Sequence, residues 1–189
     1  VNLFSAVCGS LSCVMVYIVA RRMDLTRLAS AAGALMLGAS RELWAQSVIA
    51  EVYTLNAFIF MVCLLCLVEW NRNRNPRWLM AFSFVLGLGM TNHHTIGIIG
   101  PAAVALVLWR NWRTVLKWKL VLLCTALFIL PLGIYLYLPL RAATYPYMDW
   151  GHPETISQLW SHVTRAQYKI NAEPVGGTAV SLFFEFTMV

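Results

Sequence analysis

The polar residues that could do chemistry are concentrated in three of the breaks between long apolar stretches. The first break contains a guanidinium and two carboxylates, the second contains two histidines, and the third is a long polar and aromatic segment. In chain order they hold Arg41, Glu42 and Glu51; Asn92, His93 and His94; and 141–177, with Arg141, Asp149 and Trp150. A positioned carboxylate or imidazole can bind or deprotonate a hydroxyl, and a guanidinium can bind phosphate.

Glu51 opens an apolar stretch, and a carboxylate at the edge of hydrocarbon usually faces a cavity or a partner. Arg41 and Glu42 lie at the end of the preceding stretch, close enough across a short turn to supply that partner. Two interpretations stay open. Either the residues form a structural ion pair that sets the turn, or Glu51 orients a polar donor or acceptor while Arg41 pairs with an anionic group.

His93 and His94 are adjacent at the tip between two apolar stretches. Adjacent histidines on a turn point in different directions, and no second His or Cys follows four residues later, so the sequence predicts neither a metal site nor a bound cofactor. A hydrogen-bonding role at a polar cavity is one alternative, and an ordinary solvated loop tip is the other.

The third break begins with Arg141, directly after an apolar stretch. This arginine is either a phosphate ligand or an anchor for lipid headgroups. Trp150 and two neighbouring tyrosines form either a platform for a sugar ring or part of an aromatic belt at the membrane interface. From Thr155 to about Tyr168 the residue spacing predicts an amphipathic helix that lies on the membrane surface.

These polar breaks are expected to connect membrane-spanning helices. Of the 189 residues, 60% are hydrophobic and 12% are charged, whereas about 25% would be charged in a soluble domain. A span needs roughly 20 apolar residues, and the predicted spans are 1–20, 28–46, 52–70, 78–90, 95–109 and 120–140. The predicted fold class is all-α, a polytopic bundle with an outer loop over 141–178. Residues 179–189 begin a re-entrant piece, an interfacial helix or a seventh span.

The basic residues predict the orientation of these spans. Ten of the fourteen Lys and Arg residues fall in the alternate breaks, as Arg21, Arg22, Arg27, Arg72, Arg74, Arg77, Arg110, Arg113, Lys117 and Lys119. Short basic loops stay in the cytoplasm, so the three polar breaks are expected on the extracytoplasmic face. This topology accounts for the net charge of +6, and a nucleic-acid partner is therefore not expected.

Three motifs in order resemble a multi-spanning membrane family that was once labelled as of unknown function. They are Trp44–Ser47 with Glu51–Asn56, Gly87–Thr95, and Tyr137–Arg141 followed by Asp149–Gly151. This family is related to the transmembrane protein O-mannosyltransferases and shares the GT-C glycosyltransferase architecture. The resemblance covers nearly the whole chain.

The resemblance implies a transferase that takes a sugar, such as mannose, from a polyprenyl-phosphate donor and places it on a protein or other acceptor at the outer face. Arg141 or Arg41 would then bind the phosphate, and Glu51, His93 and His94 would position the sugar or the acceptor. Tyr53, Asp149 and Trp150 complete the substrate-binding candidates. The family's catalytic acidic residue is expected in a loop before Val1, so the catalytic residue itself is left unassigned.

A transporter and a non-catalytic membrane scaffold are the competing classes. Polar groups near membrane depth and proline-interrupted helices are common in transporters, but the acidic and histidine residues gather at one rim and the two halves show no inverted repeat. The compact chain lacks an N-x-S/T glycan acceptor. This favours a bacterial inner membrane over the endoplasmic reticulum.

Overall fold

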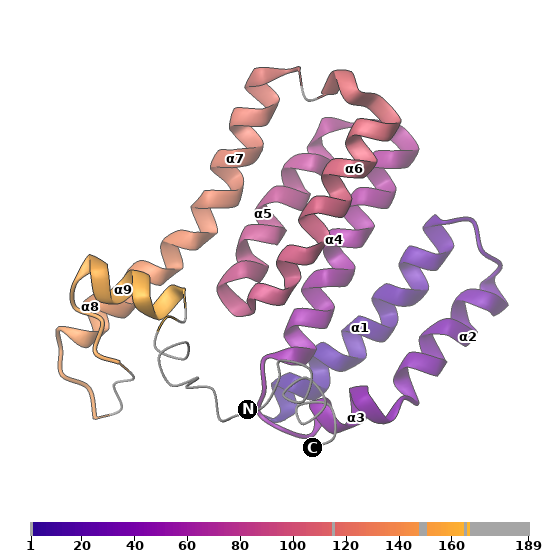
Figure 1. The fold of residues 1–189 in the computed structure, drawn as a ribbon. Helices are drawn as coiled ribbons and strands as arrows, with labels where there is room; N and C mark the ends of the chain where they lie inside the picture. Colours follow the sequence, from indigo (N-terminus) through magenta and orange to yellow (C-terminus); the bar gives the residue numbers. More distant parts are fainter. Residues whose placement is uncertain (1, 115, 148–150, 165, 167–189) are drawn as a thin grey trace, which may run out of the picture. The chain divides into compact units, whose positions relative to one another are not determined.

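A computed structural model describes residues 2–114, 116–147, 151–164 and 166, and this part of the chain is helical and contains no strand. The all-α fold class is confirmed. The chain divides into two compact units, Val1–Ile134 and Tyr135–Val189 (Figure 1).

The described part of the first unit contains six α-helices that pack along one another, a seventh, short α-helix, and two short 3-10 helices. In chain order these elements are α1 (Asn2–Arg22), α2 (Arg27–Gly38), α3 (Arg41–Ser47), α4 (Tyr53–Asn73), α5 (Pro76–Asn92), η1 (His94–Ile98), α6 (Ile99–Asn111), η2 (Trp112–Thr114) and α7 (Trp118–Leu132). A further turn, η3 (Gly133–Leu136), includes the boundary between the units.

Polar side chains mark where several helices begin. The Thr26 hydroxyl accepts a hydrogen bond from the Ala29 backbone N–H at the start of α2, and the Asn75 carboxamide accepts one from Arg77 at the start of α5. Pro76 follows Asn75 at the first helical position, where no backbone donor is needed. These caps satisfy N–H groups that have no partner within the helix.

The second predicted span, 28–46, is divided into the two helices α2 and α3. Ala39 is the C-cap of α2, and the Ser40 side chain accepts a hydrogen bond from the Leu43 N–H to begin α3. The Ser40 hydroxyl offers the backbone a hydrogen-bond partner that competes with the regular helix pattern. Gly38, two residues earlier, lowers helix propensity. The apolar composition of 28–46 concealed this break.

The core of the first unit lies around α4, which packs against α1 on one side and α5 on the other. Its buried side chains include Ile59, Cys63, Cys66 and Trp70, and both cysteines are free. The two side chains of this Cys-x-x-Cys pair therefore pack as apolar groups in the core of the helix bundle.

Gly87 allows the closest approach of two helices, because a Cβ at this position would lie 2.1 Å from the Phe128 carbonyl oxygen of α7. We expect Gly87→Ala to push α7 away from α5 and to destabilise the protein by about 1–3 kcal/mol. Gly133→Ala is the matched control, since nothing lies within 4 Å of a Cβ there. Thermal unfolding in detergent gives the melting temperatures of the Gly87 and Gly133 variants. Equal melting temperatures would contradict this close packing of α5 against α7.

Within the described residues, four helical stretches are long and apolar enough to cross a membrane. They are Asn2–Arg22, Tyr53–Asn73, His94–Thr114 and Trp118–Ala142, and Arg27–Gly38 is a shorter apolar helix. These lengths and hydropathies support an integral membrane protein. The number of crossings stays a prediction.

The second unit contains α8 (Tyr137–Ala142) and α9 (Ile156–Val163) within its described part. The Thr155 hydroxyl accepts from the Gln158 N–H while the Gln158 side chain accepts from the Thr155 N–H, and this reciprocal capping box begins α9. The helix thus starts where the sequence predicted. The segment 179–189 lies outside the described residues.

Candidate functional site

Polar side chains from three elements meet at one end of the first unit. We call this group the rim cluster: Tyr53 and Asn56 of α4, Asn92 and His93 at the end of α5, and Thr95 of η1. The Tyr53 and His93 rings lie 5.5 Å apart between centroids. The Asn56 carboxamide donates to the Thr95 hydroxyl over 3.3 Å, and a ring nitrogen of His93 lies 2.7 Å from the same hydroxyl.

The tight turn after α5 positions His93 and Thr95 within the rim cluster. The chain becomes extended at His93, whose backbone N–H still donates to the Gly89 carbonyl over 2.9 Å. Gly89 leaves room for the returning chain, because a Cβ there would lie 2.4 Å from the Ile96 side chain. The Asn92 carboxamide donates to the Val52 carbonyl over 3.2 Å and ties this turn to α4.

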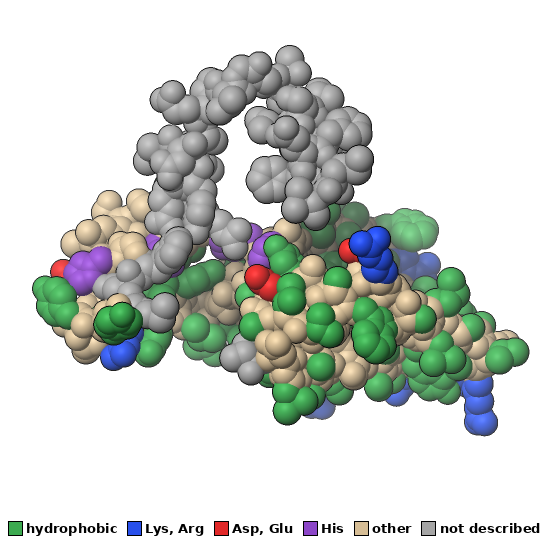
Figure 2. All heavy atoms as spheres, turned by 90° about the horizontal axis from the view of Figure 1, so that it is seen from below, with side chains coloured by type: hydrophobic (Ala, Val, Ile, Leu, Met, Phe, Trp, Pro, Cys, Tyr) green, Lys and Arg blue, Asp and Glu red, His purple; other side chains and the backbone are tan. Residues whose placement is uncertain are grey.

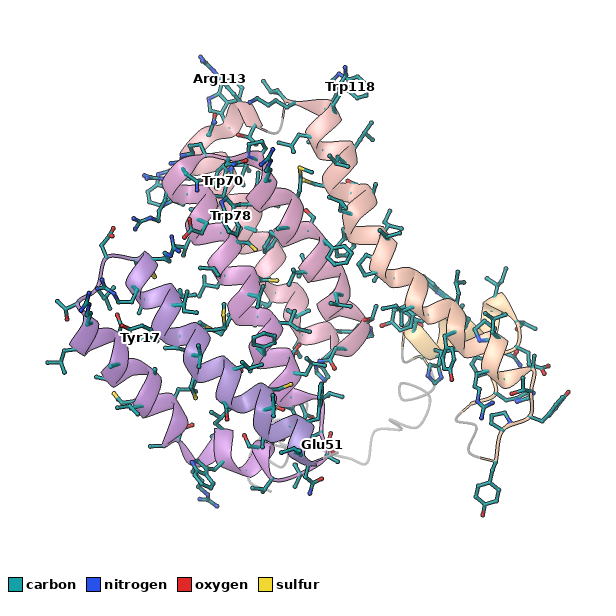
Figure 3. The ribbon with its side chains drawn as sticks, turned by 180° about the vertical axis from the view of Figure 1, so that it is seen from behind. Tyr17, Glu51, Trp70, Trp78, Arg113 and Trp118 are labelled. Atoms are coloured by element: carbon teal, nitrogen blue, oxygen red, sulfur yellow. The ribbon has the colours of Figure 1, made fainter. Side chains whose placement is uncertain are left out.

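Other polar groups reach the same end of the unit. The Asn2 side chain donates to the Val48 carbonyl over 2.9 Å, and the Ser5 hydroxyl lies 3.5 Å from the Glu51 carbonyl oxygen. The Glu51 side chain is exposed. Figure 3 shows Glu51 at the end of the unit opposite Arg113 and Trp118. Figure 2 looks onto the Glu51 end, where histidine and acidic side chains are visible on the surface.

The opposite end of the first unit is basic. Here Arg22 pairs with Glu69 over 2.9 Å, and Arg72 pairs with Asp24 over the same distance. Arg110 also donates to the Asn71 side chain over 2.8 Å. The basic breaks and the first two polar breaks therefore lie at opposite ends of this bundle, as the alternation in the sequence requires.

Three buried side-chain oxygens near the rim have no hydrogen-bond partner within the described part of the chain: Gln46 Oε1, Thr54 Oγ1 and Asn56 Oδ1. A buried acceptor without a partner costs about 1–3 kcal/mol. Asn56 is already held through its amide nitrogen by Thr95. Its carboxamide oxygen is therefore an unpartnered acceptor within the rim cluster.

The structure brings together only part of the predicted site. Tyr53 and His93 are in contact, and the half-buried His94 begins η1 beside them. Arg41 is exposed on α3, and within residues 2–114 it forms no ion pair with Glu51. The turn between α3 and α4 is therefore set without the ion pair that the sequence allowed.

The remaining predicted residues belong to the second unit. Arg141 is exposed at the end of α8, and its guanidinium donates to the Thr144 hydroxyl over 3.1 Å. In the following loop His152 lies 3.1 Å from a Glu154 carboxylate oxygen, and the Tyr145 and His152 rings are 5.3 Å apart. Asp149 and Trp150 lie outside the described residues.

Asn56 and Thr95 were not among the predicted site residues, and Asn92 was named only as part of the second polar break. Asn56 and Thr95 each end a motif that the sequence singled out, but nothing in the spacing indicated that they would share a hydrogen bond across 39 residues. No group of three or more His, Cys, Asp or Glu residues that could hold a metal ion occurs in the described ranges.

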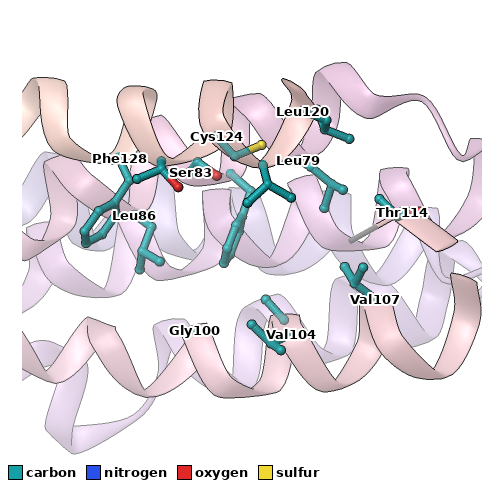
Figure 4. Close-up of a pocket in the computed structure, with 14 residues that line it drawn as sticks. Leu79, Ser83, Leu86, Gly100, Val104, Val107, Thr114, Leu120, Cys124 and Phe128 are labelled. Atoms are coloured by element: carbon teal, nitrogen blue, oxygen red, sulfur yellow. The ribbon is translucent and has the colours of Figure 1, made fainter. Parts of the chain in front are cut away.

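An apolar groove lies between α5, α6 and α7 (Figure 4). Its volume is about 340 Å³. Leu79, Phe82 and Leu86 of α5 contribute to one wall, and the other walls include Val104 of α6 and Phe128 of α7. Its size and lining suit an apolar chain.

The sequence of residues 1–116 matches a family described as the N-terminal domain of the protein O-mannosyl-transferase TMEM260. No curated protein and no solved structure matches the chain. The matched region includes all of α1 to η2, and with them the rim cluster and the basic end. The predicted relation to the protein O-mannosyltransferases is thus confirmed over residues 1–116, which contain the first two of the three motifs, and the chain belongs to the TMEM260 N-terminal domain family of protein O-mannosyltransferases.

Proposed function

We propose that this protein is an integral membrane glycosyltransferase that transfers a sugar, mannose, from a polyprenyl-phosphate donor to a protein acceptor on the extracytoplasmic face. The observation that carries the proposal is the family match over residues 1–116, because that family is named for protein O-mannosyl transfer. The positive-inside rule supports the orientation, since the rim cluster lies opposite the basic end.

The rim cluster is the proposed sugar-binding end. Sugar hydroxyls need fixed donors and acceptors, and Asn56 offers an unpartnered carboxamide oxygen beside the Tyr53 and His93 rings. Aromatic rings provide an apolar surface with a polar tip for such a ligand. In this account Glu51 and His94, which adjoin the cluster in the chain, contact the sugar or the acceptor.

The groove between α5, α6 and α7 is the proposed site of the donor's prenyl chain. Leu86 lines the groove and Asn92 ends α5 six residues later, so the groove begins about 9 Å from the rim cluster along the helix axis. A lipid-linked sugar can then keep its tail in hydrocarbon and its sugar at the wet end.

Arg141 is the proposed phosphate ligand. A guanidinium forms bidentate bonds to phosphate oxygens and can stabilise the negative charge that develops on the leaving group. Arg41 is the alternative phosphate ligand, and Asp149 and Trp150 are further proposed substrate contacts. The assignment of the membrane to a bacterial inner membrane stays a prediction from composition.

The direct test is sugar transfer by the purified protein reconstituted in lipid vesicles. Polyprenyl-phosphate carrying radiolabelled mannose is supplied with an acceptor protein rich in Ser and Thr. We expect label on the acceptor and release of polyprenyl phosphate. Movement of the labelled lipid or sugar across the vesicle membrane without transfer would contradict the proposal and would favour a transporter.

Asn56→Leu tests the rim cluster. The variant keeps the side-chain size but removes the unpartnered acceptor together with the amide that donates to Thr95, and we expect kcat/KM for the lipid-linked donor to fall at least tenfold, as for the loss of one hydrogen bond to the substrate. Asn73→Leu is the matched control, because Asn73 is exposed at the other end of α4. Steady-state kinetics of both variants measure the effect. Equal kcat/KM for the two would exclude Asn56 from the substrate site.

A further inference from the structure

We propose that the basic end of the first unit binds one anionic phospholipid, in a second groove that lies between α1, α4 and α6. This lipid site is separate from the rim cluster and goes beyond sugar transfer. The groove has a volume of about 640 Å³. The groove is assigned to phospholipids of the cytoplasmic leaflet, because basic pockets between transmembrane helices on that side attract anionic headgroups.

The walls of this second groove are apolar along most of its length. Phe60, Leu64 and Leu67 line it from α4, and Ile99, Ala102 and Leu106 line it from α6. An acyl chain needs no hydrogen-bond partners and fits such walls. Inorganic phosphate alone would leave them uncovered, so the lining indicates a ligand with an apolar tail.

Charged side chains line the mouth of the groove. Arg22, Asp24 and Arg72 line it at the basic end. Arg22 and Arg72 each use one terminal nitrogen, Nη1, in their ion pairs, and their side chains are 56% and 40% exposed. Within the described residues, the other guanidinium nitrogens of these two arginines have no partner. They can therefore bind phosphate oxygens without breaking the ion pairs.

The charge at this end favours an anionic headgroup over a zwitterionic one. Ten Lys and Arg residues lie in the three basic breaks, against two acidic residues, Asp24 and Glu69, that pair with them. At the groove mouth these two carboxylates balance Arg22 and Arg72, so the excess of positive charge belongs to the basic end as a whole, whose field surrounds the mouth.

The length of the groove matches one leaflet of a bilayer. Phe60 and Arg72 both line it and lie twelve residues apart on α4, which corresponds to about 18 Å along the helix axis. Half of a hydrocarbon core of about 30 Å is roughly 15 Å. A phospholipid with its phosphate at Arg72 would therefore place its acyl chain alongside Phe60.

The test is lipid retention by the purified protein, measured by native mass spectrometry in detergent. The probes are phosphatidylglycerol, which is anionic, and phosphatidylcholine, which is zwitterionic. We expect one phosphatidylglycerol to be retained at least tenfold more tightly than phosphatidylcholine. Equal retention of the two lipids would overturn the proposal.

Two matched pairs of variants locate the site. Ala102→Trp fills the groove and should abolish retention, whereas Ala105→Trp changes an exposed residue of the same helix that lines neither groove and should not. Arg72→Gln should weaken retention at least tenfold, and Arg77→Gln, at the same end on α5, should weaken it less than twofold. Full retention by Ala102→Trp, or equal losses for both arginine variants, would show general electrostatic attraction instead. The Ala102 variant keeps the test decisive if Arg72→Gln does not fold.

Discussion

Alanine in place of Arg141 is expected to lower kcat for transfer from a polyprenyl-phosphate donor by about a hundred- to a thousandfold. A fixed donor aimed at developing negative charge contributes this much in comparable enzymes. Arg141 is exposed at the end of α8, and among the described residues its guanidinium donates only to the Thr144 hydroxyl, so its removal leaves no buried group unpaired there. The loss should therefore be one of activity and not of stability.

Two controls separate the phosphate role of Arg141 from headgroup anchoring. Arg141→Lys keeps the charge but loses bidentate geometry, so we expect activity between those of wild type and the alanine variant. Arg113→Ala removes a cation from the basic end and should leave kcat unchanged. Single-turnover measurements with labelled donor supply the rates. Wild-type kinetics for Arg141→Ala would remove this residue from the mechanism and leave Arg41 as the phosphate ligand to test.

The second large effect is on stability, at the ion pair between Arg22 and Glu69. The Glu69 side chain is only 8% exposed, and Arg22 Nη1 lies 2.9 Å from its carboxylate. Arg22→Met leaves this buried carboxylate without its cation, and we expect a loss of about 3 kcal/mol in the free energy of unfolding. The variant should unfold at a clearly lower temperature in detergent.

A double variant tests whether the buried charge causes this loss. Arg22→Met combined with Glu69→Met removes both partners and fills the space with apolar atoms, so we expect it to recover most of the stability. Thermal unfolding of both single variants and the double variant gives the coupling energy. Additive losses would mean that the two side chains contribute independently and that the pair is not what holds α1 against α4.

The sequence predicted the parts of the fold that depend on local pattern. Hydropathy located α1, α4 and the combined helix Trp118–Ala142, and the polar start at Thr155 located α9. The break between α2 and α3 was missed because it depends on one serine cap within an otherwise apolar run. A hydropathy average does not register a single hydrogen bond.

Part of the candidate site was predicted, because the alternation of basic and polar breaks determines which breaks lie at the same end of the helix bundle. Alternation placed Tyr53 and His93 at one end, and the two rings are indeed in contact. It could not show that Asn56 and Thr95 would join them, since this depends on the tight turn allowed by Gly89. The pairing of Arg41 with Glu51 failed for a similar reason, because the separate helix α3 carries Arg41 on an exposed surface.

The contact of Glu69 with Arg22 could not be predicted from the pattern of apolar stretches. A carboxylate inside a predicted span usually faces a partner, and this one lies 47 residues from Arg22 in the chain. Because Arg22 was assigned to a basic loop, the pattern gave no reason to place the two together. The helix packing of α1 against α4 determines this contact.

The central claim is that the rim cluster faces the extracytoplasmic side and the basic end faces the cytoplasm. Single cysteines at Glu51 and at Arg113, in a variant without the five native cysteines, test it in intact cells with a membrane-impermeant maleimide. We predict that Glu51→Cys reacts from outside, whereas Arg113→Cys reacts only after the membrane is permeabilised. The reverse labelling pattern would contradict the account, because the proposed sugar site would then face the cytoplasm.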